Sequence, residues 1–310
     1  MKGLVVCSSK NQFRVRLSED EVECRIKGKI LKDIEGFYNP LAPGDIVEVE
    51  NNQIISLEER RNLFTRFNQK GQKPQLLASN LDLVLCVCSA DSPPFRPRFL
   101  DRALLQAEIA DIPAAIICNK YDLIAETGSD SLDIEERLSD YEKIGSPVFR
   151  ISIKTGEGME DFKKFIEGKF SLLLGQSGVG KSSLVNYLVP GLEIKTGKIN
   201  EKYNRGNHTT TRPMLFDIPG MEDGSKIIDT PGIRRFMPMG ISSDELINYM
   251  AEFAPLAGKC SYGLSCTHEK ERGCKIMEAV DAGVIHEERY ESFLRIRDEL
   301  SMKKPYPDND

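Results

Sequence analysis

The sequence lacks the features that mark membrane, secreted and uniformly basic proteins. Its 310 residues contain no apolar run approaching the roughly 20 residues that span a bilayer. The N-terminal segment has no apolar core long enough for a secretory signal. The net charge is −6, so the charge of the whole chain gives no sign of a nucleic-acid binder. We therefore expect a cytoplasmic protein that does not enter a membrane and whose thiols stay reduced.

Basic residues are nevertheless concentrated in two stretches. The first extends from Arg60 to Lys73 without an acidic residue, and the second extends from Lys195 to Arg212 with Glu201 as its one interruption. The chain beyond residue 240 is acidic. Either stretch could contact a phosphate backbone or could be a solvated loop, and the charges alone do not distinguish the two.

Short β-type runs separated by turn residues fill residues 1–68. Several short strands in so few residues predict a small β-barrel of the OB type, with Cys7 and Cys24 in its core. Such a barrel could bind RNA on one face or serve protein contacts alone. The runs are Leu4–Val6, Gln12–Leu17, Val22–Ile26 and Ile46–Val49.

The pattern changes after a basic linker, which we predict from Arg60 to Pro74. Strands then alternate with helices, which is typical of an α/β unit with a parallel sheet. Cys86, Cys88 and Cys118 fall on apolar strands and are expected in the core. We predict strands at 81–88, 114–118, 147–151 and 170–174, and helices at 98–110, 132–144 and 159–166.

The segment from Gly175 to Ser182 reads G-Q-S-G-V-G-K-S, which matches a phosphate-binding loop. It follows an apolar run and precedes a helix, so backbone N–H groups and the helix dipole favour an anion there. Lys181 can reach the β- and γ-phosphates, and the Ser182 hydroxyl can bind Mg²⁺. The expected phosphate contacts are Gly175, Gln176, Ser177, Gly178, Val179, Gly180, Lys181, Ser182 and Ser183.

Two further motifs indicate a guanine base. Asn119, Lys120 and Asp122 form N-K-x-D at the end of a predicted strand. The Asp122 carboxylate can accept two parallel N–H bonds from guanine, which adenine does not offer. After the next strand, Ser152-Ile153-Lys154 resembles the base-supporting S-A-K motif, with isoleucine in place of alanine.

The remaining nucleotide motifs come last in the chain. Thr210 or Thr211 can close over Mg²⁺ as switch I. Asp229-Thr230-Pro231-Gly232 matches D-x-x-G, in which Asp229 holds the Mg²⁺ shell and the Gly232 N–H meets the γ-phosphate. The base-reading motifs precede the phosphate-reading motifs, so the sequence predicts a circularly permuted GTPase domain.

A metal signature lies near the C-terminus. Cys260, Cys266, His268 and Cys274 give C-x5-C-x-H-x5-C, which brings together three of eight cysteines and one of only three histidines. Three thiolates and one imidazole match a closed, structural Zn²⁺ site. We predict flanking helices at 243–253 and 285–302.

Together these motifs resemble the circularly permuted ribosome-assembly GTPases of the RsgA (YjeQ) family. The resemblance covers nearly the whole chain and implies an OB-type barrel at 1–68, a P-loop GTPase domain at 69–238 and a zinc-binding helical module at 239–310. It further implies a GTPase of late small-subunit (30S) maturation that the subunit stimulates and that contacts 16S rRNA. Ile153 and Asn207 depart from the family pattern. We expect a monomer that binds GTP or GDP, Mg²⁺ and one Zn²⁺.

The expected catalytic groups are Lys181, Gly232 and His208. Many GTPases place glutamine after the D-x-x-G glycine to orient the attacking water. Here that residue is Ile233, which has no hydrogen-bonding side chain. His208, beside the switch I threonines, is the nearest candidate for this role, although it could instead contact RNA or cap a turn.

Two competing functions remain open from the sequence. One is an RNA scaffold that binds a nucleotide without hydrolysing it, which the intact Lys181, Ser182 and Asp229 oppose. The other is a P-loop kinase or ATPase, which Asn119 and Asp122 oppose.

Replacing Asp122 should change base selectivity. Asp122→Asn should weaken GTP binding by about 2 kcal/mol or more, because polar groups in the site lose their partners. It should shift preference toward the xanthine nucleotide, whose 2-oxo group needs a donor. Titration with both nucleotides measures this, and unchanged GTP affinity would contradict the assignment of the motif.

Overall fold

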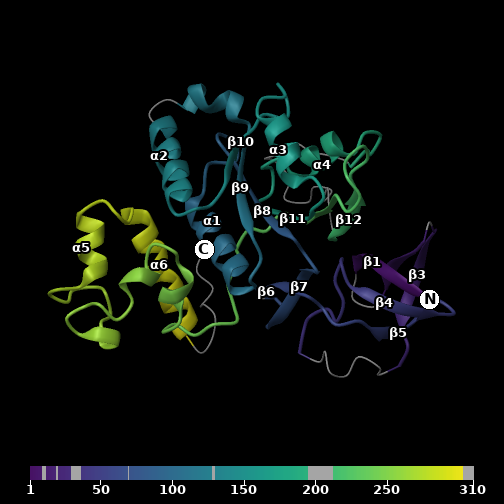
Figure 1. Cartoon of the computed structure of the whole chain (residues 1–310), viewed down its shortest axis with the longest axis horizontal. Helices are drawn as coiled ribbons and strands as arrows, with labels where there is room; N and C mark the ends of the chain where they lie inside the picture. Colours follow the sequence, from purple (N-terminus) through teal and green to yellow (C-terminus); the bar gives the residue numbers. More distant parts are fainter. Residues whose placement is uncertain are drawn as a thin grey trace.

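The computed structural model describes residues 1–8, 12–18, 20–28, 36–68, 70–127, 130–194 and 212–302. It shows an N-terminal barrel, a central α/β unit and a C-terminal module at the opposite end from the barrel (Figure 1). Among these residues, no helix has both the length and the apolar character that crossing a bilayer requires.

The N-terminal strands close into a five-stranded barrel. The hydrogen-bonded order is β1, β2, β3, β5, β4 and back to β1, with β3 and β5 parallel and the other pairs antiparallel. Apolar side chains such as Phe13 and Val47 fill its interior, and Cys7 and Cys24 are buried as predicted. The strands are β1 (Lys2–Ser8), β2 (Phe13–Leu17), β3 (Asp20–Ile26), β4 (Ile46–Glu50) and β5 (Gln53–Leu57).

The predicted basic linker is wrong. Its residues form an antiparallel hairpin of β6 (Leu63–Asn68) and β7 (Lys73–Ser79), in which Phe64 is buried. Arg60 is not in a solvated loop either, because its guanidinium forms two 2.7 Å bonds to the carboxylate of Asp45. Phe64 on β6 and Leu77 and Ala78 on β7 are buried in the core, which explains why this stretch forms a hairpin and not a linker.

The α/β unit contributes six strands in the order β10, β9, β8, β11, β13, β12, and the sheet continues into the barrel through the antiparallel pair of β12 and β1. All neighbours are parallel except β12, which is antiparallel to β13. The strand β11, which leads into the phosphate loop, lies centrally although β8 and β9 precede it in the chain. The strands are β8 (Leu83–Ser89), β9 (Ala114–Asn119), β10 (Val148–Arg150), β11 (Phe170–Gly175), β12 (Met214–Asp217) and β13 (Lys226–Asp229).

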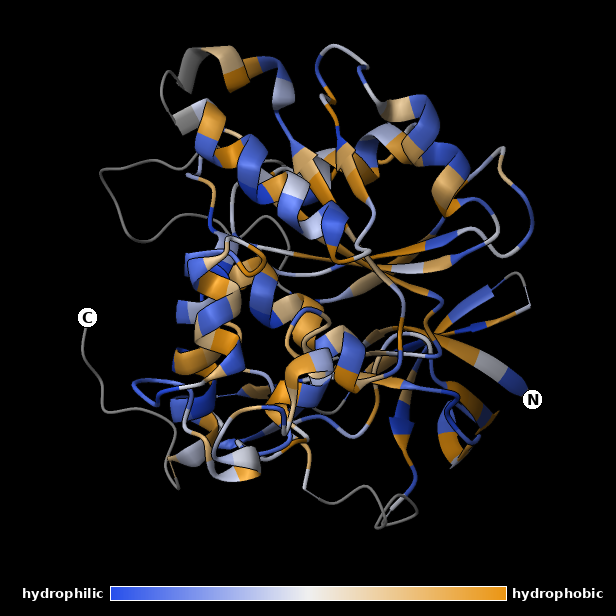
Figure 2. Cartoon of the chain, turned by 60° about the vertical axis from the view of Figure 1, so that its left-hand side comes forward, coloured by the Kyte–Doolittle hydropathy of each residue, from blue (hydrophilic) through white to orange (hydrophobic). Residues whose placement is uncertain are grey.

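Helices cover both faces of this sheet. Helices α1 and α2 pack on the face that carries even-numbered residues of β8, such as Cys86 and Cys88. Helices α3 and α4 pack on the opposite face, which carries odd-numbered residues such as Leu85. This alternation follows from the period of two along a strand, and the strands are largely hydrophobic in Figure 2. The helices are α1 (Pro97–Ile109), α2 (Asp130–Lys143), α3 (Met159–Ile166) and α4 (Lys181–Leu188).

The C-terminal module contains less regular helix than predicted. In place of a helix at 243–253 there are short 3-10 turns. The apolar residues of this segment are still buried. The elements are η3 (Leu246–Tyr249), η4 (Ala254–Leu256), η5 (Gly263–Ser265), α5 (Lys275–Asp281) and α6 (Glu287–Ser301).

Buried charges join this module to the α/β unit. The Asp101 carboxylate on α1 accepts bonds from Arg289 Nη1 at 2.8 Å and from Tyr141 Oη at 2.6 Å. Arg289, on α6, also pairs with Glu252 at 2.6 and 3.0 Å. Because each buried charge has a partner, the seam avoids the cost of an isolated buried ion.

Asp45 ties the barrel to the hairpin, and its loss should be costly. Its fully buried carboxylate also accepts bonds from Ala42 N at 2.9 Å and Ser79 Oγ at 2.5 Å. Asp45→Ala should lower the free energy of unfolding by about 3 kcal/mol, since Arg60 is left buried without its partner. Urea denaturation measures this. The exposed Glu50→Ala is the matched control, and equal effects of the two variants would contradict the prediction.

Candidate nucleotide and metal sites

The phosphate loop joins β11 to α4 at the carboxyl edge of the sheet, and two of its positions admit only glycine. A Cβ at Gly175 would lie 2.4 Å from the Val87 carbonyl oxygen. A Cβ at Gly180 would lie 2.2 Å from Asn119 Nδ2, and Gly180 has a φ of 101°. The loop therefore lies directly against the ends of β8 and β9.

Lys181 is folded into this loop. Its Nζ donates to the carbonyl oxygens of Gly175 and Gln176, each at 2.9 Å. Burial lowers the pKa of Lys181 to about 8, although the Asp229 carboxylate acts in the opposite direction. A phosphate anion beside the ammonium would favour its charged form.

The candidate magnesium ligands meet beside the same loop. Ser182 Oγ donates to Asp229 Oδ2 at 2.8 Å, and Asp229 is fully buried at the end of β13. The next residue, Thr230, donates to the Leu173 carbonyl oxygen at 2.6 Å, which fixes β13 against β11. One hydroxyl and one carboxylate oxygen are donors that suit a hard cation such as Mg²⁺. Thr210, Thr211 and His208 lie outside the described residues.

The D-x-x-G segment passes closely over the phosphate loop. A Cβ at Gly232 would lie 2.6 Å from the Cα of Ser177. Ile233 N donates to the Gly175 carbonyl oxygen at 3.1 Å, and the Ile233 side chain is only 3% exposed. Ile233 therefore belongs to the core and has no side chain that could orient a water molecule.

The base-reading residues converge on the same edge. Asn119 Nδ2 donates to the Val179 carbonyl oxygen at 2.9 Å, and Lys120 Nζ donates to that of Gly178 at 3.1 Å. Both bonds fix N-K-x-D to the phosphate loop. Asp122 follows in the first turn of η2 (Tyr121–Thr127).

The second base-reading loop is tied to the first by backbone. Tyr121 N donates to the Ile151 carbonyl oxygen at 3.0 Å. Ser152 is fully buried and its Oγ accepts a bond from Thr155 N at 3.1 Å. The turn through Ile153 and Lys154 thus lies beside N-K-x-D.

Comparison with known proteins identifies the family. The model of the RsgA GTPase family matches residues 57–238, which is more than half of the chain. The chain belongs to this family. It is a GTP-hydrolysing enzyme.

Relatives of this RsgA family member align over almost their full lengths. The small ribosomal subunit biogenesis GTPase RsgA of Bacteroides fragilis is 39% identical over 302 residues, covering 95% of both chains. The protein of that name from Porphyromonas gingivalis is 36% identical over 318 residues, covering 99% of this chain and 100% of the relative.

Two solved structures share the fold. YjeQ from Thermotoga maritima has a TM-score of 0.70 and 30% identity, and the match covers 96% of this chain and 98% of YjeQ. YloQ, described as a circularly permuted GTPase, has a TM-score of 0.65 and 25% identity, covering 99% and 96%. The predicted circular permutation and the multidomain fold class are confirmed.

The structure of this RsgA family member also brings together the four predicted metal ligands. The ligand atoms of Cys260, Cys266, His268 and Cys274 all lie within 4.8 Å of one another. His268 Nδ1 is 3.6 Å from Cys260 Sγ and 3.5 Å from Cys274 Sγ, and these two sulfurs are 3.9 Å apart.

These spacings fit a tetrahedral metal site. Bond lengths of about 2.3 Å to sulfur and 2.0 Å to nitrogen place two sulfurs about 3.8 Å apart and a sulfur and a nitrogen about 3.5 Å apart. Burial raises the pKa of the Cys266 and Cys274 thiols, which a divalent cation would offset. His286 is not among these ligands, because its Nδ1 caps α6 by accepting a bond from Glu288 N at 3.1 Å.

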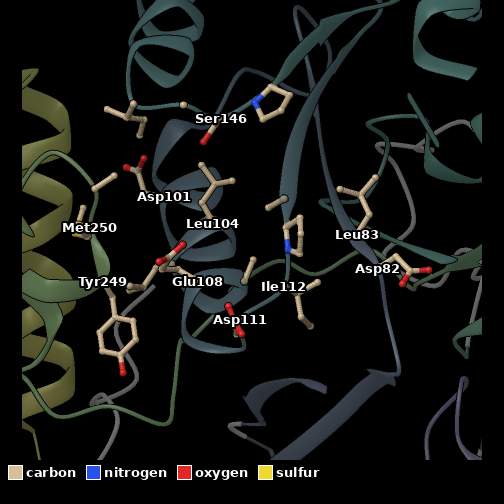
Figure 3. A pocket seen from close by; sticks show the side chains of 18 of the residues that line it. Asp82, Leu83, Asp101, Leu104, Glu108, Asp111, Ile112, Ser146, Tyr249 and Met250 are labelled. Carbon is tan, nitrogen blue, oxygen red and sulfur yellow. The ribbon is translucent and has the colours of Figure 1, made fainter. Parts of the chain in front are cut away.

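A cavity of about 600 Å³ lies away from the nucleotide loops. Figure 3 shows Leu104, Glu108, Tyr249 and Met250 around it. It is lined by α1, by the loops before β9 and β10 and by the start of the C-terminal module. The cavity therefore belongs to the seam between two units.

The sequence did not indicate the residues outside the two base-reading loops that hold these loops in place. Glu135 on α2 bonds both Tyr121 and Arg150, which lie in or beside the two base-reading loops. Nor did the sequence indicate the pairing of Asp101 with Arg289, which are 188 positions apart. No local spacing links such residues, so only the fold reveals them.

Removal of metal should unfold the C-terminal module selectively. The purified chain should contain about one Zn per molecule, and Cys274→Ser should lose it together with helical structure, because the thiolates are core residues. Elemental analysis and circular dichroism measure both. Cys24→Ala in the barrel should keep the metal. A Cys274→Ser protein that retains zinc and its full helical content would exclude the structural role.

Proposed function

We propose that this RsgA family member hydrolyses GTP during late maturation of the small (30S) ribosomal subunit, as a cytoplasmic monomer that the subunit stimulates. The main support is the convergence of phosphate, magnesium and guanine groups at one sheet edge, on a chain whose full-length relatives are named for small-subunit biogenesis. The barrel and the C-terminal module are the proposed contacts to 16S rRNA.

The roles of the residues follow from their positions. Lys181 neutralises β- and γ-phosphate charge, and loop N–H groups from Gly175 to Ser183 bind the phosphate oxygens. Ser182 and Asp229 hold Mg²⁺, which supplies further charge stabilisation when bound. Gly232 offers its N–H to the γ-phosphate. Asp122 selects guanine, with Asn119, Lys120 and the 152–154 loop supporting the base.

The metal of the C-terminal module is proposed to be one structural Zn²⁺. Three cysteines and one histidine form the donor set, and Lys275 N donates to Cys260 Sγ at 3.3 Å. A closed set of four protein ligands leaves no position for a substrate, so its role is to hold the module together.

The segment after Gly232 supports a link between nucleotide state and the other units. Phe236 is buried with its ring centroid 5.9 Å from that of Phe64 on β6 and 6.2 Å from that of Phe99 on α1. Phe67 N donates to the Met237 carbonyl oxygen at 3.3 Å. A shift of Gly232 on loss of the γ-phosphate would therefore act on both the hairpin and α1.

GTP turnover titrated with purified 30S subunits tests this function. Turnover should rise with subunit concentration to saturation. A Lys181→Ala control should abolish it, because the phosphate charge is then unopposed. Turnover that is absent with and without subunits would favour the scaffold function, and ATP turnover in place of GTP would favour the kinase or ATPase function.

His208 is the proposed water-positioning group, and it lies outside the described residues. His208→Ala should keep GTP affinity and GTP-dependent subunit binding but reduce subunit-stimulated kcat by roughly 10²-fold, because hydrolysis depends on positioning the water. Single-turnover assays on the subunit measure this. A variant that keeps the wild-type rate would show that backbone or the ribosome holds the water.

A further inference from the structure

A carboxylate on α2 connects the two loops that read the base. Glu135 Oε1 accepts a bond from Tyr121 Oη at 2.7 Å, and Glu135 Oε2 accepts one from Arg150 Nε at 3.0 Å. Tyr121 immediately precedes Asp122, and Arg150 lies two residues before Ser152. A single side chain thus braces both base-reading loops from the side of α2.

The surroundings of Glu135 make this connection well defined. Tyr121 packs on the core that also contains Ile134 and Leu138 of α2. Burial and then the bond to Glu135 raise the pKa of Tyr121 to about 12, so its hydroxyl is a neutral donor at neutral pH. The second acid facing Arg150 is Glu142, whose Oε1 accepts a bond from Arg150 Nη1 at 2.7 Å.

The nucleotide site gives this brace a function. Asp122 must present both carboxylate oxygens to one edge of the base, and an error in its position weakens both bonds. Backbone bonds join the two loops at Ile151, whose N donates to the Cys118 carbonyl oxygen at 2.9 Å and whose carbonyl oxygen accepts from Tyr121 N at 3.0 Å. Glu135 adds side-chain bonds to the residues on either side of this backbone link, Tyr121 and Arg150, so it limits rotation of the first turn of η2.

We propose that Glu135 is a positioning residue that sets guanine affinity by holding Asp122 and the 152–154 loop in their binding arrangement. The proposal rests on the proposed guanine site. Glu135 has no direct contact with the base and acts through Tyr121 and Arg150. A preorganised pair of loops binds more tightly because less ordering accompanies binding.

Glu135→Ala should weaken GDP binding roughly five- to tenfold, since two side-chain bonds are lost. The kcat for GTP at saturation should be unchanged, because the phosphate loop is not involved. Glu135→Gln should be intermediate, because its amide oxygen can still accept the Tyr121 bond while the charge pairing with Arg150 is lost.

Binding of inosine diphosphate (IDP) distinguishes an effect of Glu135 through Asp122 from a general loss of structure. Inosine lacks the 2-amino group, so it can form only one of the two bonds to Asp122. Glu135→Ala should therefore weaken IDP binding only roughly two- to threefold. Competition against a fluorescent GDP analogue measures both affinities.

Matched variants complete the test. Glu136→Ala removes a neighbouring exposed carboxylate from α2 and should leave both affinities unchanged. Tyr121→Phe removes one of the two bonds and should weaken GDP binding by a smaller factor, which tests the proposal even where Glu135→Ala fails to fold. Equal weakening of GDP and IDP, or none for GDP, overturns the proposal. A wild-type chain that binds no guanine nucleotide overturns the guanine site itself.

Discussion

Close backbone approach at the phosphate loop is the constraint on which the rest of the site depends. Hypothetical Cβ atoms at Gly175, Gly180 and Gly232 would each lie within 2.6 Å of a neighbouring loop or strand. Those neighbours are the end of β8, the side chain of Asn119 and the backbone of Ser177. The phosphate, base and switch segments therefore meet only because three positions carry no side chain.

In the circularly permuted chain, the strand that leads into the phosphate loop lies in the middle of the sheet. β11 lies between β8 and β13, so the base-reading strands come from before the phosphate loop and the switch strand from after it. Among the described residues, the chain after Gly232 forms no further strand of the sheet. It instead packs Phe236 between the hairpin and α1 before entering the C-terminal module. Contacts to the hairpin and to α1 consequently originate within a few residues of Gly232.

Features with a local signature could be predicted from the sequence. Strand alternation, the phosphate loop and the cysteine and histidine spacing each depend on near neighbours, and the structure places Cys260 and Cys274 together as their spacing suggests. The hairpin was not predicted, because Arg60, Arg61, Arg66, Lys70 and Lys73 made this stretch resemble a basic linker. The braces formed by Asp45, Asp101 and Glu135 join residues 14 to 188 positions apart, so no periodicity indicates them.

The packing of Ile233 determines whether this residue can help to orient the attacking water. Its side chain is buried in the same core cluster as Phe236, and its N–H is bonded to Gly175. Rotation of this residue toward the γ-phosphate would expose an apolar group and break a bond to the phosphate loop, both of which are unfavourable. A glutamine in this place would be equally unsuited to a core position. Ile233, which begins the connection to the C-terminal module, thus serves packing. A water molecule at the γ-phosphate must therefore be oriented by a group from another segment or from a bound partner. That requirement gives a physical reason for the proposed dependence of hydrolysis on the small subunit.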